Sequence, residues 1–66
     1  MDVKFPDVTV QLTGEDGNVF GVIGRVAKAL KRAGHVEGAA EFTAAAFASK
    51  SYDEVLRLAM QTVEVQ

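Results

Sequence analysis

The residues with the greatest potential for chemistry lie between Gly14 and Gly34, where a glycine-rich acidic turn leads into a basic helix. Backbone N–H groups at the start of a helix attract anions, and glycine lets a phosphate approach the backbone closely. The pattern Gly-x-Gly-x-x-Gly, however, cannot be drawn through the glycines of this segment, which are Gly14, Gly17, Gly21 and Gly24. Glu15 and Asp16 would also repel a phosphate here. The turn is therefore predicted to cap its own helix, and no cofactor-binding residue is assigned.

The same turn offers oxygen ligands to a metal ion through Glu15, Asp16 and Asn18, but their spacing does not match the EF-hand pattern. His35 is the only histidine and cysteine is absent, so the serines have no motif that would make one of them a nucleophile. His35 follows Gly34 at a helix end, where a solvated histidine is expected. We therefore assign no catalytic and no metal-binding residue. The expectation is a non-enzyme, and a metal- or phosphate-dependent enzyme is the least favoured alternative.

Positive charge gathers on one face of the predicted first helix. Residues 19–36 contain basic residues and no acidic ones, although the whole chain has 9 acidic residues and a net charge of -2. Gly21 and Gly24 fall toward this basic side, although each costs about 1 kcal/mol relative to alanine inside a helix. Close approach of another backbone, from a neighbouring element or a partner, would explain them, as would a helix that starts late. The candidate partner-binding face consists of Gly21, Gly24, Arg25, Lys28, Lys31 and Arg32.

Hydrophobic patterning predicts the elements that position this face. Residues 1–6 are expected to form a loose lead-in that ends at Pro6, because proline cannot donate to a sheet. Val8–Thr13 alternates apolar and polar residues, which predicts a half-buried strand. Asn18, or Asp16 before it, is expected to cap a helix that ends at Gly34. The apolar arc of this helix consists of Val19, Val22, Ile23, Val26, Leu30 and Ala33.

Two further helices are predicted in the second half of the chain. Residues 37–48 are rich in alanine, which favours a helix. Phe42 and Phe47 point about 140° apart on it, which indicates packing on more than one side. Ser51 and Glu54 have the spacing of a capping box at the start of the third helix.

The last alternating residues, Val63–Val65, can leave the third helix and pair with the first strand. The predicted fold is thus α+β: a small, helix-dominated single domain over residues 1–66, in the order β-α-α-α with a short closing strand. A domain of this size buries only about 60% of its unfolded surface, and without cysteine it has no disulfide to support it. A two-stranded sheet also leaves an open edge. A homodimer is therefore expected.

Composition narrows the function further. The absence of cysteine fits a cytoplasmic protein, and no apolar run approaches the roughly 18 residues of a membrane span. The first expectation is a non-catalytic interaction or regulatory module, with Phe20, Phe42, Phe47 and Tyr52 as core anchors or partner contacts. The alternative is a nucleic-acid-binding regulator similar to ribbon-helix-helix dimers, which would use the basic helix face together with Thr9, Gln11 and Thr13. The negative net charge of the chain disfavours nucleic-acid binding, because phosphate binding scales with the number of Lys and Arg contacts.

Several stretches together resemble a group of small, uncharacterised proteins of actinobacteria and their phages and mobile elements. The residues that carry the resemblance are Gly14-x-Asp16-Gly17-Asn18-x-Phe20, Gly24-x-Val26, Ala29-Leu30-x-x-Ala33-Gly34, Glu41-Phe42, Tyr52-Asp53-x-x-Leu56 and Met60-x-x-Val63-x-Val65. The resemblance extends from Val8 onward and implies a single domain of actinobacterial or phage source. The alanine-rich stretch Ala44–Ser51 departs from the Gly/Asp-containing turn of the group. No functional residue is carried over from it.

Overall fold

The computed structural model describes residues 3–12 and 18–66, so that Thr13 and the predicted turn with Glu15 and Asp16 lie outside the described residues. The elements are β1 (Phe5–Val10), α1 (Val19–Arg32), α2 (Val36–Ala48), α3 (Tyr52–Thr62) and β2 (Val63–Val65). β1 and β2 form a two-stranded parallel sheet, with all three helices between them in the chain. The predicted α+β class, the β-α-α-α order and the closing strand are confirmed.

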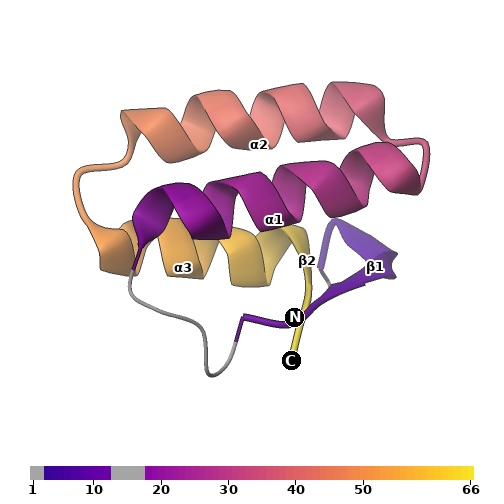
Figure 1. Ribbon diagram of the computed structural model, residues 1–66, viewed down its shortest axis with the longest axis horizontal. Coiled ribbons are helices and arrows are strands. Elements are labelled where there is room, and N and C mark those ends of the chain that lie inside the picture. Colours follow the sequence, from indigo (N-terminus) through magenta and orange to yellow (C-terminus); the bar gives the residue numbers. More distant parts are fainter. Residues whose placement is uncertain (1–2, 13–17) are drawn as a thin grey trace.

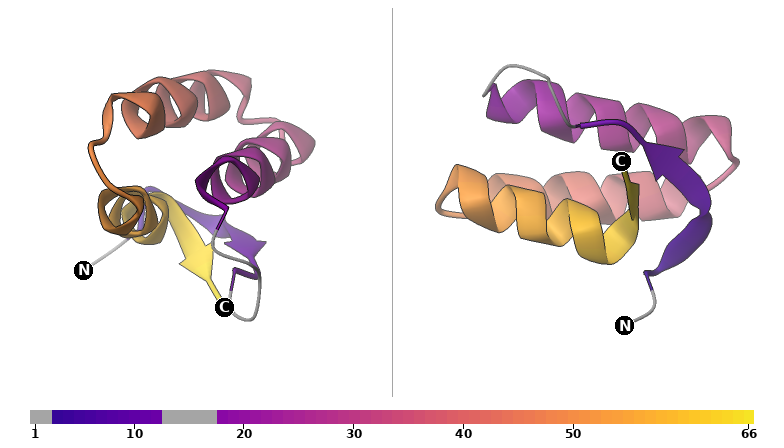
Figure 2. Two further views of the ribbon diagram at one scale, coloured as in Figure 1. Left: turned by 60° about the vertical axis from the view of Figure 1, so that its left-hand side comes forward. Right: turned by 90° about the horizontal axis from the view of Figure 1, so that it is seen from below.

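The three helices pack side by side as a triangular bundle, and the sheet closes one side of it (Figures 1 and 2). α1 and α3 lie next to the sheet, whereas α2 lies across α1 and α3 from it (Figure 2). The core between these layers is formed by side chains from every element, and its most enclosed large members are Leu30, Val26 and Val63. The predicted arc of α1 supplies Val22 and Ile23 as well. Ala33, the last member of that arc, is exposed.

β1 begins earlier than the alternation predicts. Phe5 and Pro6, which were expected in a loose lead-in, belong to the strand. The N–H of Lys4 already donates to the carbonyl of Gln61 (3.0 Å). The register is irregular between Phe5 and Thr9, around a proline that has no N–H to donate. The sheet thus accommodates Pro6 through this irregularity instead of starting after it.

β1 also ends earlier than predicted. It stops at Val10, although the N–H of Leu12 still donates to the carbonyl of Gln66 (3.0 Å) beyond the short β2. Within the strand the alternation is correct, because Val8 and Val10 are both buried. β2 has only three residues, which limits the length over which β1 can remain paired.

The predicted helix caps are confirmed at α1 and α3. The Asn18 carboxamide accepts a hydrogen bond from the backbone N–H two residues later (2.9 Å), and Gly34 follows α1 with a φ of 89°. At α3, the Ser51 hydroxyl accepts from the N–H of Glu54 (3.1 Å). The Glu54 carboxylate in turn accepts from the N–H of Lys50 (2.8 Å), one residue before the position that a capping box uses.

α2 packs into the core with one face, so the prediction of packing on more than one side is wrong. Phe42 is 3% exposed, whereas Phe47 is 59% exposed and its ring lies 5.9 Å from that of Phe20 on the surface. The close approach on the buried side occurs at Gly38. A Cβ there would lie 2.5 Å from Cζ of Phe5, so the absence of a side chain makes room for the aromatic ring of β1.

Candidate functional site

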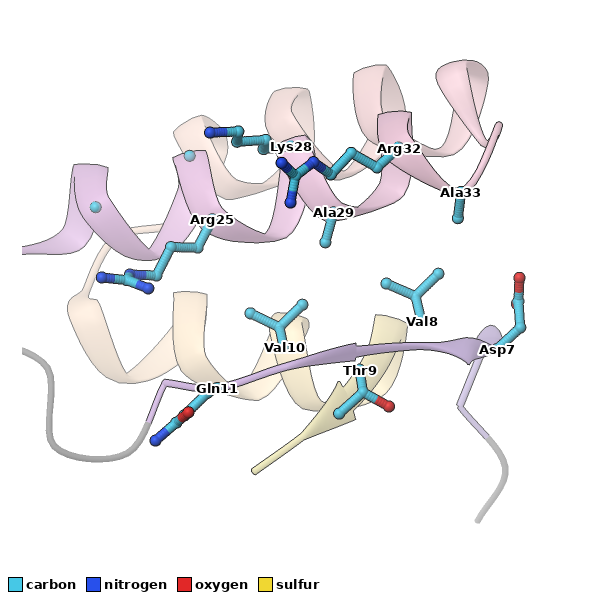
Figure 3. A pocket seen from close by; sticks show the side chains of 12 residues that line it. Asp7, Val8, Thr9, Val10, Gln11, Arg25, Lys28, Ala29, Arg32 and Ala33 are labelled. Atoms are coloured by element: carbon cyan, nitrogen blue, oxygen red, sulfur yellow. The ribbon is translucent and has the colours of Figure 1, made fainter.

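A groove between β1 and α1 contains most of the predicted partner-binding face (Figure 3). β1 and the residue after it supply residues 7–11, and α1 supplies one face of the helix. The predicted residues that line the groove are Gly21, Gly24, Arg25, Lys28 and Arg32. Lys31 is exposed but does not line it. The structure therefore brings these residues together with the edge of the strand that contains Thr9 and Gln11.

The floor of the groove is apolar. Val8 and Val10 point from β1 toward α1, where Ala29 and Ala33 lie opposite them (Figure 3). Thr9 points away from α1, as the two-residue period of a strand requires. The residues of α1 that face the groove here are alanines, while Val8 and Val10 are only 4% and 6% exposed and contribute little accessible apolar area themselves.

The helix side of the groove is basic. Arg25, Lys28 and Arg32, here called the basic wall, are all exposed and share one face because of their helical spacing. The ion pairs between described residues join other side chains, so Lys28 and Arg32 have no carboxylate partner within the described part of the chain. These two side chains thus present unneutralised positive charge beside the apolar floor.

Gly21 and Gly24, here called the glycine strip, leave part of the helix side without side chains. Both lie inside α1, which begins at Val19, so a late start of the helix does not explain them. A Cβ on Gly24 would meet nothing within 4 Å, and one on Gly21 would meet only the Cβ of Asn18 at 3.8 Å. No described element approaches the strip, so the predicted contact with a neighbouring element is wrong for the described residues.

The outer edge of β1 borders the same groove. The carbonyl of Val10 accepts from the N–H of Gln66 (2.9 Å), and the N–H of Leu12 donates to the carbonyl of Gln66 (3.0 Å), so these alternate residues face β2. Consecutive strand residues direct their main-chain groups to opposite edges. Thr9 and Gln11 therefore direct theirs to the groove. The sheet has two strands in the described part of the chain, and neither of them pairs with this edge.

Asp7 lines the groove and pairs with His35, which lies outside it, and sequence reasoning missed this pairing. Nε2 of His35 lies 2.8 Å from Oδ2 of Asp7, and the imidazole ring packs on Phe5 with 4.5 Å between ring centroids. The side chain of His35 is 30% exposed, so the expected solvated histidine is only partly solvated. The hydrogen bond from His35 lowers the pKa of Asp7 below its usual value of 3.8. Twenty-eight residues separate the pair, which leaves no local pattern to reveal it.

An aromatic patch lies away from the groove. Phe20 is 65% exposed, Phe47 59% and Tyr52 38%, and they come from the start of α1, the end of α2 and the start of α3. Of the four predicted aromatic contacts, only Phe42 is a core anchor. Lys50 lines the same pocket as these three rings and is the one charged residue there among the described residues. The groove between β1 and α1 combines several charged side chains with a strand edge and is the better defined site.

The described residues hold no cluster of three or more His, Cys, Asp or Glu side chains that could bind a metal ion. The weak cation site considered at Glu15 and Asp16 lies outside them. In residues 3–12 and 18–66, no helix has both the length and the apolar character needed to cross a membrane. Comparison of the chain with known proteins finds no matching family model, no matching curated protein and no matching solved structure.

Proposed function

We propose that this chain is a small cytoplasmic, non-catalytic interaction module that binds a partner protein in the groove between β1 and α1. The observation that carries the proposal is the meeting of an apolar floor, the glycine strip and the basic wall in one groove. Protein interfaces combine an apolar centre with a polar rim, and arginine is enriched in them. Among the described residues that line the groove, Asp7 is the one acid, and it is paired with His35.

A homodimer is the alternative within this proposal. Two copies could join the free edges of their β1 strands, as the small size of the domain would favour. Such pairing brings the basic wall of one copy toward that of the other, and like charges that face each other are destabilising. A different protein in the groove is therefore preferred.

A nucleic-acid-binding regulator stays the second candidate, because Lys28 and Arg32 are exposed on one face. The net charge of -2 opposes it, since affinity for nucleic acid rises with the number of phosphates that Lys and Arg neutralise. Of the three strand residues considered for base contacts, Thr9 and Gln11 point away from α1 (Figure 3), while Thr13 lies outside the described residues. The basic wall and these side chains thus lie on different sides of β1. The proposed resemblance to small actinobacterial and phage proteins suggests a source for the partner but not its identity.

Site-specific photocrosslinking in the native host tests the proposal. A photoreactive amino acid replaces Gln11, which lines the groove at its strand edge although its side chain points away from α1 (Figure 3). As a control, it replaces the exposed Ala40 on α2, which does not line the groove. We expect the probe at Gln11 to crosslink a distinct protein and the probe at Ala40 not to do so. Gly24→Leu should abolish the crosslink, because leucine is a good helix former and its side chain would enter the groove.

Three results would reject a partner protein in the groove. Crosslinks from Gln11 that persist in Gly24→Leu would place contact elsewhere. Crosslinks only to a second copy of this chain would indicate a homodimer, and sedimentation equilibrium would give its stoichiometry. Crosslinks only to nucleic acid would favour the regulator.

A further inference from the structure

We infer that the groove binds an extended acidic segment of the partner, which joins the sheet as a third strand along the free edge of β1. This inference rests on the proposed function and specifies the chemistry of the partner. It combines an unpaired strand edge, unneutralised positive charge and a strip of helix without side chains, all of which border one groove.

The strand edge supplies main-chain hydrogen bonds. The N–H and carbonyl groups of Thr9 and the N–H of Gln11 face the groove, because Val10 and Leu12 direct theirs to Gln66 beyond β2. An extended segment can pair with these groups without regard to its sequence. A helical ligand cannot, because its N–H and carbonyl groups are already bonded within the helix. The free edge therefore favours an extended ligand.

The basic wall supplies the selectivity for acidic side chains. Lys28 and Arg32 are four residues apart on α1, so their Cα atoms are about 6 Å apart along the helix axis. Alternate residues of a strand lie about 6.8 Å apart and point to the same face. An added strand with acidic residues at every second position thus places successive carboxylates beside Lys28 and Arg32. The same wall would repel a second copy of α1, which carries the same charges.

The glycine strip supplies space at the end of the groove near the start of α1. Gly21 and Gly24 line the groove, and a Cβ on Gly24 has no neighbour within 4 Å. Alanine at this position would favour the helix, so the isolated domain gains nothing from the glycine. If an added strand approaches the backbone of α1 closely, the absence of a side chain at Gly24 provides the space for it.

A synthetic peptide provides the direct test. The probe has seven residues, with glutamate at every second position between valine and threonine, and capped ends. Amide chemical shifts of the isotope-labelled, full-length protein report its binding site. We expect saturable shifts centred on Thr9 and Gln11. The same peptide with glutamine in place of glutamate should bind at least tenfold more weakly, and a version N-methylated at alternate residues should not bind.

Charge reversal in the protein completes the test, with a matched control on the same helix. Lys28→Glu and Arg32→Glu should each weaken binding of the acidic peptide at least tenfold. Lys31→Glu makes the same change of charge outside the groove and should alter binding less than twofold. Gly24→Ala should raise the melting temperature of the free protein and still weaken peptide binding, which separates the binding role of this position from a role in folding.

The outcomes distinguish the proposed acidic segment from the broader proposal that a partner protein binds in the groove. If Gln11 crosslinks a partner protein but the glutamine peptide binds as tightly as the glutamate peptide, the groove is an interaction site and the acidic segment is wrong. Equal loss of binding in Lys31→Glu and Arg32→Glu, or shifts that avoid Thr9 and Gln11, would also overturn it. If a short DNA duplex binds at the basic wall and the peptide does not, both the acidic segment and the partner protein are rejected.

Discussion

Gly38 and Phe5 determine how closely β1 approaches α2. The Phe5 ring occupies the place where a side chain at position 38 would lie, and it also packs against the imidazole of His35. Glycine is a poor helix former, so its presence within α2 has a steric cause. By contrast, Gly24 has open space around its Cα. Gly38 and Gly24 thus stand inside helices for different reasons. Only their contacts in three dimensions distinguish the two cases.

Gly38→Ala is expected to destabilise the protein by about 1 kcal/mol. Overpacking costs about 1–3 kcal/mol, and the better helix propensity of alanine offsets about 1 kcal/mol of it. Urea unfolding followed by circular dichroism measures the change. Gly24→Ala is the control and should stabilise by up to about 1 kcal/mol. Phe5→Leu combined with Gly38→Ala should recover part of the loss, and equal effects of Gly38→Ala with and without Phe5 would contradict the steric explanation.

Asp7 is expected to make stability dependent on pH in the acid range. Its pKa is lowered in the folded protein by the hydrogen bond from His35, so the folded state favours the carboxylate. This contribution is complete above 3.8 and is lost as the pH falls through the lower folded pKa. The difference in unfolding free energy between the protein and Asp7→Asn should therefore shrink with pH below 3.8. A difference that stays constant down to about pH 2, measured by urea unfolding at each pH, would show that Asp7 does not contribute through its charge.

Residues at the helix ends determine where α1 and α3 begin and where α1 stops. Asn18 and Ser51 each accept a hydrogen bond from an N–H in the first turn, and Gly34 ends the first helix with a positive φ. α2 differs, because His35 at its start makes no side-chain cap. α2 depends on its buried face and on alanine propensity instead.

Ser51→Ala is expected to destabilise the protein by about 1 kcal/mol, because the first turn of α3 loses the acceptor for one N–H. In a domain of this size that corresponds to a fall in melting temperature of about 4–8 °C. Ser51→Asp should retain most of the stability, since aspartate also accepts at an N-cap. An unchanged melting temperature for Ser51→Ala would mean that the hydrogen bond from the N–H of Lys50 to the Glu54 carboxylate is sufficient to hold this helix end.

The whole molecule has one small core shared by all five elements. At about 0.05–0.15 kcal/mol per residue, a chain of 66 residues has a stability of about 3–10 kcal/mol. Leu30, on α1, is fully buried in that core. Loss of one such side chain is therefore comparable to the stability of the entire domain.

Leu30→Ala is expected to cost about 2–5 kcal/mol and to leave a large fraction of the protein unfolded at 25 °C. Circular dichroism and dispersion of the amide resonances measure that fraction. Leu30→Met conserves volume and should cost less than about 1.5 kcal/mol. A loss below about 1 kcal/mol for Leu30→Ala would indicate that the core can collapse around the missing side chain.

The sequence by itself determined the helices and the caps of α1 and α3, because these depend on residues within about four positions of one another. The alternation of Val63–Val65 indicated the short closing strand, although its pairing partner lies at the other end of the chain. The sequence also predicted that Gly21, Gly24 and the basic residues of α1 share one face. Only the tertiary structure decided that the strands run parallel, that Asp7 meets His35, and that this face borders the free edge of β1. Those relations join residues far apart in the chain, and they depend on how the helices between the strands pack. The basic face of α1 borders a groove because the chain passes through three helices before β2 pairs with the opposite edge of β1.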